Sequence, residues 1–418
     1  MAGSKTSSTK RISGQQLPDG RIPMTGSVGP SGSVSTLSSD RQMKHQKRRV
    51  NRPALYRSLK RLHFWLTTIT ALPLAIMSIT GALLVFGQEW EAALWPELRE
   101  VSATDQGLAP HSYDRIAAVL AKDHPQLRVW AYTPSKRPDQ AWVLWLAANA
   151  GILNVDPATG KTLLHYRAYE TPADVVRGLH RFLMAHPSIR PWVRHLLSAT
   201  ALLLALQILV GIALWAVPPK PWRNLKISFR SGARLGVLRL HQTAGLVTAL
   251  FLIIIAVTGI SMHWTAPTRA ILEALLRQTV QMSPDPDQFS DLAPLGSLDE
   301  AVALAQARFP NARVSGVRPP AQPGNAMVVS FDQPDAWVSG SVVVGDHPPR
   351  ILTIYDGKTA NLATIIWTLR YSVHLGHFAD GSQAEVPVRL LWLVLALAPL
   401  GFAGSGLWLH SQRRRQAR

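Results

Sequence analysis

Histidine occurs at two matched positions where long apolar segments begin. His63 and His241 each complete the tripeptide Arg-Leu-His, and each is followed seventeen residues later by a Thr-Gly pair whose glycines are Gly81 and Gly259. Neutral imidazole is the commonest metal ligand in proteins and a frequent axial ligand of haem iron. Matched histidines in two halves of a chain can offer two imidazoles to one iron. We therefore expect His63 and His241 to hold one haem between them.

A second pair of histidines is matched in the same way. His180 and His374 each stand shortly before another apolar segment, whereas His63 and His241 stand at the start of theirs. Histidines that lie at the same ends of their helices can share a haem, so His180 and His374 are expected to hold a second one. Two haems at different depths in a membrane would form a path for electrons across it.

The glycines suggest how a haem could approach the helices. Residues eighteen positions apart fall on the same stripe of an α-helix, so Gly81 shares a stripe with His63, and Gly259 with His241, about 27 Å along the axis. We expect each bare glycine to admit the flat face of a macrocycle. Thr-Gly also serves as a packing contact between membrane helices, and a lone histidine at a helix end often anchors the interface. The duplication favours the haem interpretation.

Three other histidines are reserve candidates for ligands. His377 lies three residues after His374, one helical turn away if that stretch is helical, and could replace it or contact substrate. His195 and His263 flank two apolar segments, and neither has a counterpart in the other half. That lack of a match favours an interfacial role for both. No catalytic residue is assigned.

Four uncharged apolar runs must position these residues. They cover about residues 62–86, 196–217, 245–264 and 390–409, and each reaches the roughly 20 residues that a helix needs to cross a bilayer. The first run follows a basic leader of 61 residues and is longer than the apolar core of a signal peptide. We expect it to remain as an anchor, and the fold to be a four-helix transmembrane bundle made of two pseudo-repeats.

The net charge of +19 is concentrated in three segments. Residues 1–61 hold 13 Lys or Arg and 2 Asp or Glu, residues 218–240 hold 6 and none, and the residues after 409 hold 4 and none. Short basic segments stay on the cytoplasmic side of a membrane, so both termini and the loop are expected there. The expected partner of these charges is membrane lipid and not nucleic acid.

The two long segments between the apolar runs are expected to face the periplasm of a bacterial inner membrane. Each begins with a helical pattern, at residues 112–123 and 297–309, and continues with short strand-like stretches and turns that contain Asp and Gly. Each is expected to be a small α+β module. The expected map is a disordered cytoplasmic tail (1–50), helix one (51–87), module one (88–193), helix two (194–217), a cytoplasmic loop (218–240), helix three (241–264), module two (265–387), helix four (388–410) and a cytoplasmic tail (411–418).

Cysteine is absent. Its absence excludes disulfides, iron–sulfur clusters and covalent attachment of haem through Cys-x-x-Cys-His. The expected cofactor is therefore haem b, in two copies. The sequence also holds no dinucleotide, P-loop or zincin motif. Electrons are expected from a quinol, or from a cytoplasmic or membrane reductase.

These features together resemble the PepSY-associated transmembrane proteins, a family that includes inner-membrane ferric-siderophore reductases and iron-regulated membrane proteins. The likeness rests on Leu-His and Thr-Gly in helices one and three, on Gly-Leu-His-Arg before helix two, on Val-His-Leu-Gly-His-Phe before helix four, and on the turn Asp-x-x-Thr-Gly-Lys. It covers about residues 55–410. The resemblance implies PepSY-like exported modules and an oxidoreductase that reduces a ferric-siderophore chelate in the periplasm, releasing Fe(II) for iron uptake.

Two other functions stay open. In the family that the chain resembles, PepSY modules are associated with binding and with restraint of peptidases, so the helices could merely anchor a non-redox binding or regulatory protein. The chain could also be a haem electron carrier to another acceptor. Matched histidines at helix ends, which anchoring does not require, favour a redox role.

Overall fold

Four helices dominate the structure, a computed structural model that describes residues 52–96, 101, 112–137, 140–230 and 232–416. The predicted tail over residues 1–50 lies outside the described residues, as do residues 417–418. The four helices are long and apolar enough to cross a membrane, and the chain is a multi-pass membrane protein. They are α2 (Arg52–Val85), α6 (Arg190–Ala216), α7 (Ala233–His263) and α11 (Glu385–Gln416).

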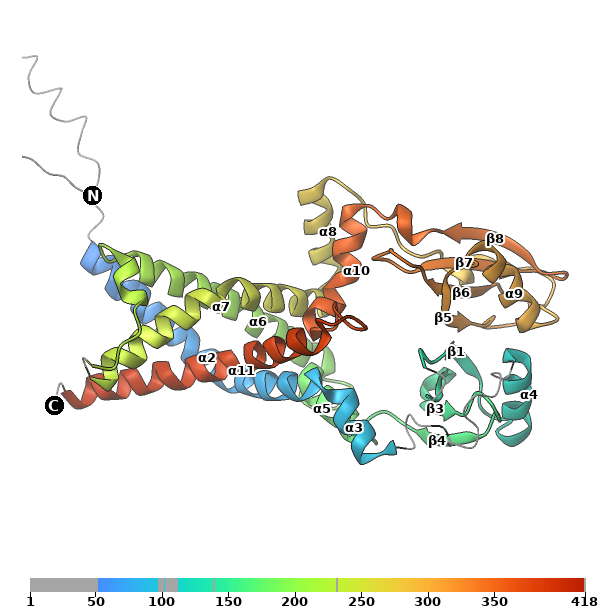
Figure 1. Ribbon diagram of the computed structural model, residues 1–418, viewed down its shortest axis with the longest axis horizontal. Coiled ribbons are helices and arrows are strands. Elements are labelled where there is room, and N and C mark those ends of the chain that lie inside the picture. The colour runs from blue at the N-terminus through green and yellow to red at the C-terminus, as the bar shows by residue number, and fades with distance from the viewer. Residues whose placement is uncertain (1–51, 97–100, 102–111, 138–139, 231, 417–418) are drawn as a thin grey trace, which may run out of the picture. The chain divides into compact units, whose positions relative to one another are not determined.

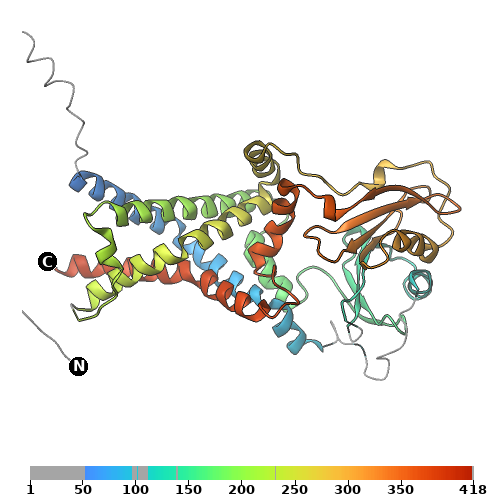
Figure 2. The same cartoon turned by 45° about the horizontal axis from the view of Figure 1, so that its top comes forward.

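The four long helices form a bundle in which each packs against two neighbours (Figures 1 and 2). Helices α2 and α7 each contact both α6 and α11, so α2 and α7 occupy opposite corners of the bundle. This is the arrangement of two pseudo-repeats, in which α2 matches α7 and α6 matches α11. We call the end where α2 and α7 begin the tail end. The opposite end, from which the strand-bearing segments leave, is called the sheet end.

Short helices gather at the sheet end of the bundle (Figure 1). Helix α5 packs against α2, and α10 packs against α7 and α8. The sequence does not predict α5 or α10 as separate elements, although each carries one histidine of the second pair. The short helices outside the sheet layer are α3 (Gly87–Leu94), α5 (Pro172–Phe182), α8 (Thr265–Leu276) and α10 (Leu362–Leu375), and the 3₁₀ turns are η3 (Ala147–Asn149), η4 (Pro221–Leu225), η5 (Pro286–Gln288) and η6 (Gly357–Thr359).

The segments between the long helices share one antiparallel sheet of eight strands, in the order β4-β3-β2-β1-β5-β6-β7-β8. Its two halves join where β1 pairs with β5, with Tyr132 opposite Val317. The sequence predicts two separate modules, whereas the structure joins their edges into one sheet, which removes two unpaired strand edges. The strands are β1 (Val129–Thr133), β2 (Trp142–Leu146), β3 (Ile152–Val155), β4 (Thr162–Tyr166), β5 (Arg313–Arg318), β6 (Met327–Asp332), β7 (Gly340–Gly345) and β8 (Arg350–Tyr355).

One hydrophobic core underlies both halves of this sheet. Helices α4 (Tyr113–Asp123) and α9 (Leu298–Arg308) confirm the two predicted helical patterns. Ile116 of α4 and Ala305 of α9 are buried in the same cluster as Leu144 of the first half and Phe331 of the second. The two strand-bearing segments therefore form one α+β unit.

Helices α4 and α9 cap each other at their first turns. Asp114 of α4 accepts hydrogen bonds from the backbone N–H groups of Leu298 (2.8 Å) and Asp299 (3.2 Å) of α9. Asp299 in turn accepts from the N–H groups of Tyr113 (2.8 Å) and Asp114 (3.3 Å) of α4. The first N–H groups of a helix have no partner within it, and carboxylates there are favoured by the helix dipole. This exchange holds the two halves together.

Asp114→Asn is expected to weaken the reciprocal capping of α4 and α9, because an amide has one acceptor oxygen where the carboxylate has two. We expect amide hydrogen exchange over the first turn of α9 to rise about fivefold, corresponding to about 1 kcal/mol for one lost cap. Mass spectrometry of the full chain in detergent measures it. Asp123→Asn, at the other end of α4, is the control and is expected to leave that exchange unchanged.

The same contact predicts a pH dependence. Burial alone would raise the pKa of Asp114, but hydrogen bonds from Ser297 and from the Leu298 and Asp299 N–H groups outweigh it and lower the pKa. A carboxyl group whose pKa falls on folding contributes stability above its unfolded pKa, and the contribution is lost as pH falls through the folded value. The difference between wild type and Asp114→Asn in the protection of the first turn of α9 should therefore persist at pH 7 and shrink below about pH 4. If this difference grew on acidification, the reciprocal capping by Asp114 would be contradicted.

Candidate functional site

At the sheet end, His180 and His374 point into the bundle from α5 and α10. Their ring centres lie 6.3 Å apart, with 51° between the ring planes. Burial, followed by the charge of neighbouring His374, lowers the pKa of His180 to about 4, and burial also lowers the pKa of His374. Both imidazoles are therefore neutral near pH 7, which is the form that binds a metal ion.

A threonine of a long helix fixes the orientation of each of these rings. The Oγ1 atoms of Thr80 and Thr258 lie 2.9 Å and 3.1 Å from the Nδ1 atoms of His180 and His374. Each hydroxyl donates its own proton to a backbone carbonyl one turn earlier in its helix, so its oxygen accepts from Nδ1–H. The Ile255 carbonyl, 3.1 Å from the Nδ1 of His374, can likewise only accept. The tautomer is thereby set, and Nε2 carries the lone pair.

The two glycines next to these threonines lie under the imidazoles. A Cβ atom on Gly81 would approach Cε1 of His180 to 3.2 Å, and one on Gly259 would approach Cε1 of His374 to 3.0 Å. The sequence predicts that the glycines leave room for a macrocycle on the stripes of His63 and His241. In the structure an imidazole of the other pair adjoins each glycine, because α5 and α10 fold back onto α2 and α7.

At the tail end, His63 of α2 faces His241 of α7. Their ring centres lie 6.4 Å apart, with 81° between the planes. The Nδ1 of His241 lies 2.7 Å from Ser405 Oγ, whose own proton goes to the Phe402 carbonyl. Serine therefore sets this tautomer as threonine does at the other end. The Nδ1 of His63 is buried and, within the described part of the chain, has no hydrogen-bond partner.

A glycine also adjoins each ring at the tail end. A Cβ atom on Gly211 of α6 would lie 3.4 Å from Cε1 of His63, and one on Gly406 of α11 would lie 4.0 Å from Cε1 of His241. All four imidazoles thus pack against a glycine of a neighbouring long helix. The sequence does not predict that Thr80, Ser405 or Gly211 contacts a histidine ring, although the repeated Thr-Gly pair at 80–81 and the Gly-Ser-Gly stretch at 404–406 mark two of these places.

The ring separations suit a haem better than a bare metal ion. Two imidazoles that face each other across one metal, each with a nitrogen roughly 2 Å from it, have ring centres roughly 6 Å apart. Over the described residues, no group of three or more His, Cys, Asp or Glu side chains could hold a metal ion. An ion at either pair would have two protein ligands. Iron in a porphyrin brings four nitrogens of its own and needs only two more.

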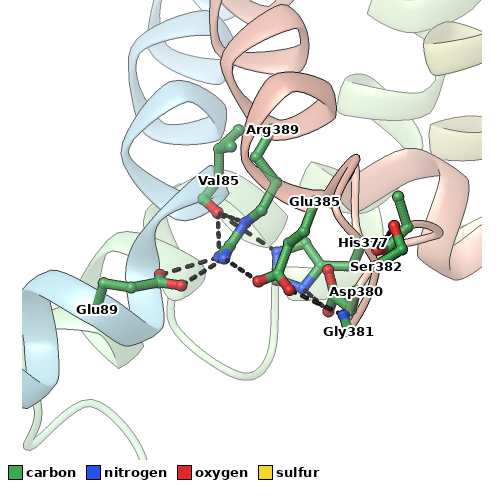
Figure 3. A network of polar contacts seen from close by, with 9 residues as sticks. Val85, Glu89, His377, Asp380, Gly381, Ser382, Glu385 and Arg389 are labelled. Carbon is green, nitrogen blue, oxygen red and sulfur yellow. Dashed lines mark hydrogen bonds and ion pairs between the residues drawn. The ribbon is translucent and has the colours of Figure 1, made fainter.

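The reserve histidines lie elsewhere. The rings of His195 and His263 come together with centres 4.7 Å apart, and Trp264 Nε1 donates to His195 Nδ1 at 2.9 Å. Helix α10 ends at Leu375 and Gly376 caps it, so His377 lies beyond the helix and is not one turn from His374 in a continuous helix. Its ring faces Asp380 (3.0 Å) and the Val85 carbonyl (3.4 Å), as Figure 3 shows. The ring that lies next to His180 is that of His374.

A comparison with family models decides the family. The model described as the PepSY-associated TM region matches residues 60–413, which spans all four histidines and both strand-bearing segments. The chain belongs to the PepSY-associated transmembrane family. No curated protein matches the chain. The matched region of this PepSY-associated protein begins close to the start of α2 and ends within the last turns of α11.

Gly259→Ala is expected to destabilise this PepSY-associated protein, because the new Cβ would meet the His374 ring at 3.0 Å. We expect a loss of about 1–3 kcal/mol from overpacking, with the ring displaced from Thr258. Gly404→Ala on α11 is the matched control, since a Cβ there would meet nothing within 4 Å. Its stability should be unchanged or higher, because alanine favours a helix. Thermal unfolding in detergent compares the two, and equal effects would contradict the close contact.

Proposed function

We propose that this protein is a b-type dihaem electron-transfer protein of the bacterial inner membrane that reduces ferric-siderophore chelates in the periplasm. The observation that carries the proposal is the meeting of two histidine pairs at opposite ends of the bundle, with ring centres 6.4 Å and 6.3 Å apart. Anchoring helices would not need either pair. A non-redox binding protein is therefore the weaker alternative.

The residues of the chain hold and orient the cofactor. His63 and His241 would ligate one haem, and His180 and His374 the other. Thr80, Thr258 and Ser405 keep the Nδ1 protons away from the metal side of the rings. When bound, haem supplies a carrier for one electron at each end of the bundle. A quinol, or a cytoplasmic or membrane reductase, is the proposed donor.

The charge pattern supports the proposed sidedness. The loop between α6 and α7, residues 218–240, holds six Lys or Arg and no Asp or Glu, and the residues after 409 hold four and none. Basic loops of this length stay on the cytoplasmic side. Both tails then face the cytoplasm, and the eight-stranded sheet faces the periplasm.

The proposed substrate follows from the chemistry of Fe(III). Hydroxamate and catecholate oxygens are hard ligands that hold Fe(III) far better than Fe(II). One electron therefore weakens the chelate without destroying the carrier and releases Fe(II) for uptake. Docking of the chelate is assigned to the strand-bearing unit, which is the part outside the bilayer.

The test is a haem count followed by oxidation kinetics on detergent-purified protein. We expect two haems b per chain, and fast oxidation of the dithionite-reduced protein by ferric hydroxamate or catecholate chelates in stopped flow. A haem-free protein that still functions in cells would remove the proposal. Two haems without chelate-dependent oxidation would instead assign the electrons to another acceptor.

A further inference from the structure

The tail end of the bundle holds buried nitrogen atoms that lack partners. In the part of the chain that the structure describes, Trp215 Nε1, His410 Nε2, Arg239 Nε and the Nδ1 of His63 are buried without a hydrogen-bond partner. A buried polar atom left unpaired costs about 1–3 kcal/mol. Four nitrogens at one end of a bundle call for an explanation, and an absent ligand is one.

Two of these nitrogens occupy matching places in the pseudo-repeats. Trp215 lies four residues after Gly211 on α6, and His410 lies four residues after Gly406 on α11. The glycines are where α6 and α11 adjoin the rings of His63 and His241. Four residues make about one helical turn on the same stripe, a rise of about 6 Å. Each half therefore presents one ring nitrogen a turn beyond its histidine, toward the tail end.

One contact keeps His410 beside the histidine pair. The ring of His410 stacks on Phe64, the residue after His63, with centres 4.3 Å apart. Arg239 does not share this place, because residues two apart lie on different faces of a helix and its Nη1 donates to the Lys226 carbonyl at 3.5 Å. The sequence suggests that Trp215 anchors the membrane interface and that His410 contacts lipid headgroups. A ring nitrogen in either role would be exposed to headgroups or water, whereas both are buried.

The missing ligand must offer an acceptor to Trp215, because tryptophan Nε1–H can only donate, and the Nε2 of His410 can donate as well. No carboxylate side chain is at hand, because residues 52–66, 205–245 and 400–418 contain no Asp or Glu. Haem b carries two carboxylates on one edge of its ring, and the pseudo-repeat offers one ring nitrogen from each half.

We propose that Trp215 and His410 bind the two carboxylates of the haem held by His63 and His241, which turns that edge of the haem toward the tail end. The inference rests on the proposed function. It adds two residues to the site and gives the tail-end haem an orientation.

The test follows haem transfer from the purified holoprotein to apomyoglobin by visible absorbance. Trp215→Phe and His410→Phe each remove the nitrogen and keep a flat ring. We expect each to speed one of the two phases of haem loss roughly tenfold, the size of one charged hydrogen bond, and to leave the other phase unchanged. Trp408→Phe is the control, since Trp408 is 37% exposed, and should alter neither phase.

A second arm replaces the carboxylates. Haem-depleted protein refilled with the dimethyl ester of haem b should lose it at the same rate in wild type and both variants. Unchanged rates with haem b, equal acceleration of both phases, or an effect that persists with the ester would each overturn the inference. Failure of the proposed function shows separately, because wild type would then carry no haem before transfer begins.

Discussion

His63→Ala and His241→Ala are each expected to lower the haem content from about two per chain to about one, and to lower it by the same haem. His180→Ala and His374→Ala should each remove the other. The reason is geometric, since each pair has ring centres close to the roughly 6 Å that two imidazoles on one metal require. A single remaining imidazole would leave the iron one protein ligand short. The pyridine haemochrome assay gives the content, and the spectrum of the reduced protein identifies the haem that remains.

Combining variants makes this prediction sharper. The double variant His63→Ala/His241→Ala should lose no more haem than either single change, whereas His63→Ala/His374→Ala should lose nearly all of it. His195→Ala and His263→Ala are the controls, because their rings meet each other and Trp264 rather than either pair. Loss of different haems from His63→Ala and His241→Ala would contradict the pairing.

Much of the bundle could be predicted from the sequence. A run of about 20 uncharged apolar residues has few alternatives to a membrane helix, and each of the four predicted runs lies within or overlaps a long helix, although α7 begins at Ala233, well before the predicted run 245–264. Strand β4 was missed because Leu163 and Leu164 break the alternation. The sequence also does not predict the pairing of β1 with β5, because strands pair through backbone hydrogen bonds, which the pattern of side chains does not show.

The site divides in the same way. The four histidines occupy matched positions in the two halves of the sequence, which predicts the two pairs. The structure brings the two rings of each pair together. The groups around the rings were not predicted. Thr80 and Gly81 meet His180 only because α5 folds back onto α2, and Ser405 meets His241 only because α11 packs beside α7. Contacts of that kind depend on helix packing, which a single sequence does not display.

One buried charge joins the sheet end of α2 to α11. Arg389 is 4% exposed, and its guanidinium donates to both carboxylate oxygens of Glu89 (Figure 3). It also donates to the Val85 carbonyl from Nε (3.2 Å) and Nη2 (2.9 Å), and to Glu385 (3.2 Å). Val85 is the last residue of α2, where helix carbonyls lack partners and the dipole favours a cation. Arg389 therefore ends α2 and ties it to α11.

Arg389→Met is expected to destabilise the protein by about 2–3 kcal/mol, somewhat less than the loss of a fully buried ion pair, because the Glu89 side chain is half exposed. The change leaves the Val85 carbonyl unpaired and two carboxylates without their cation. Arg389→Lys should recover only part of the loss, since an ammonium cannot donate to Glu89 and Val85 in a fork. The double variant Glu89→Gln/Arg389→Met should cost less than the sum of its parts.

Thermal unfolding in detergent measures these differences, and Arg350→Met is the control. Arg350 pairs with Asp346 on the surface of the strand-bearing unit, where its side chain is 63% exposed, and exposed pairs of this kind contribute little. If Arg389→Met were as mild as Arg350→Met, the network would be a surface feature and α2 would end without it. A large loss from Arg389→Met alone would show instead that the sheet end, where α10 must bring His374 to His180, depends on one buried guanidinium.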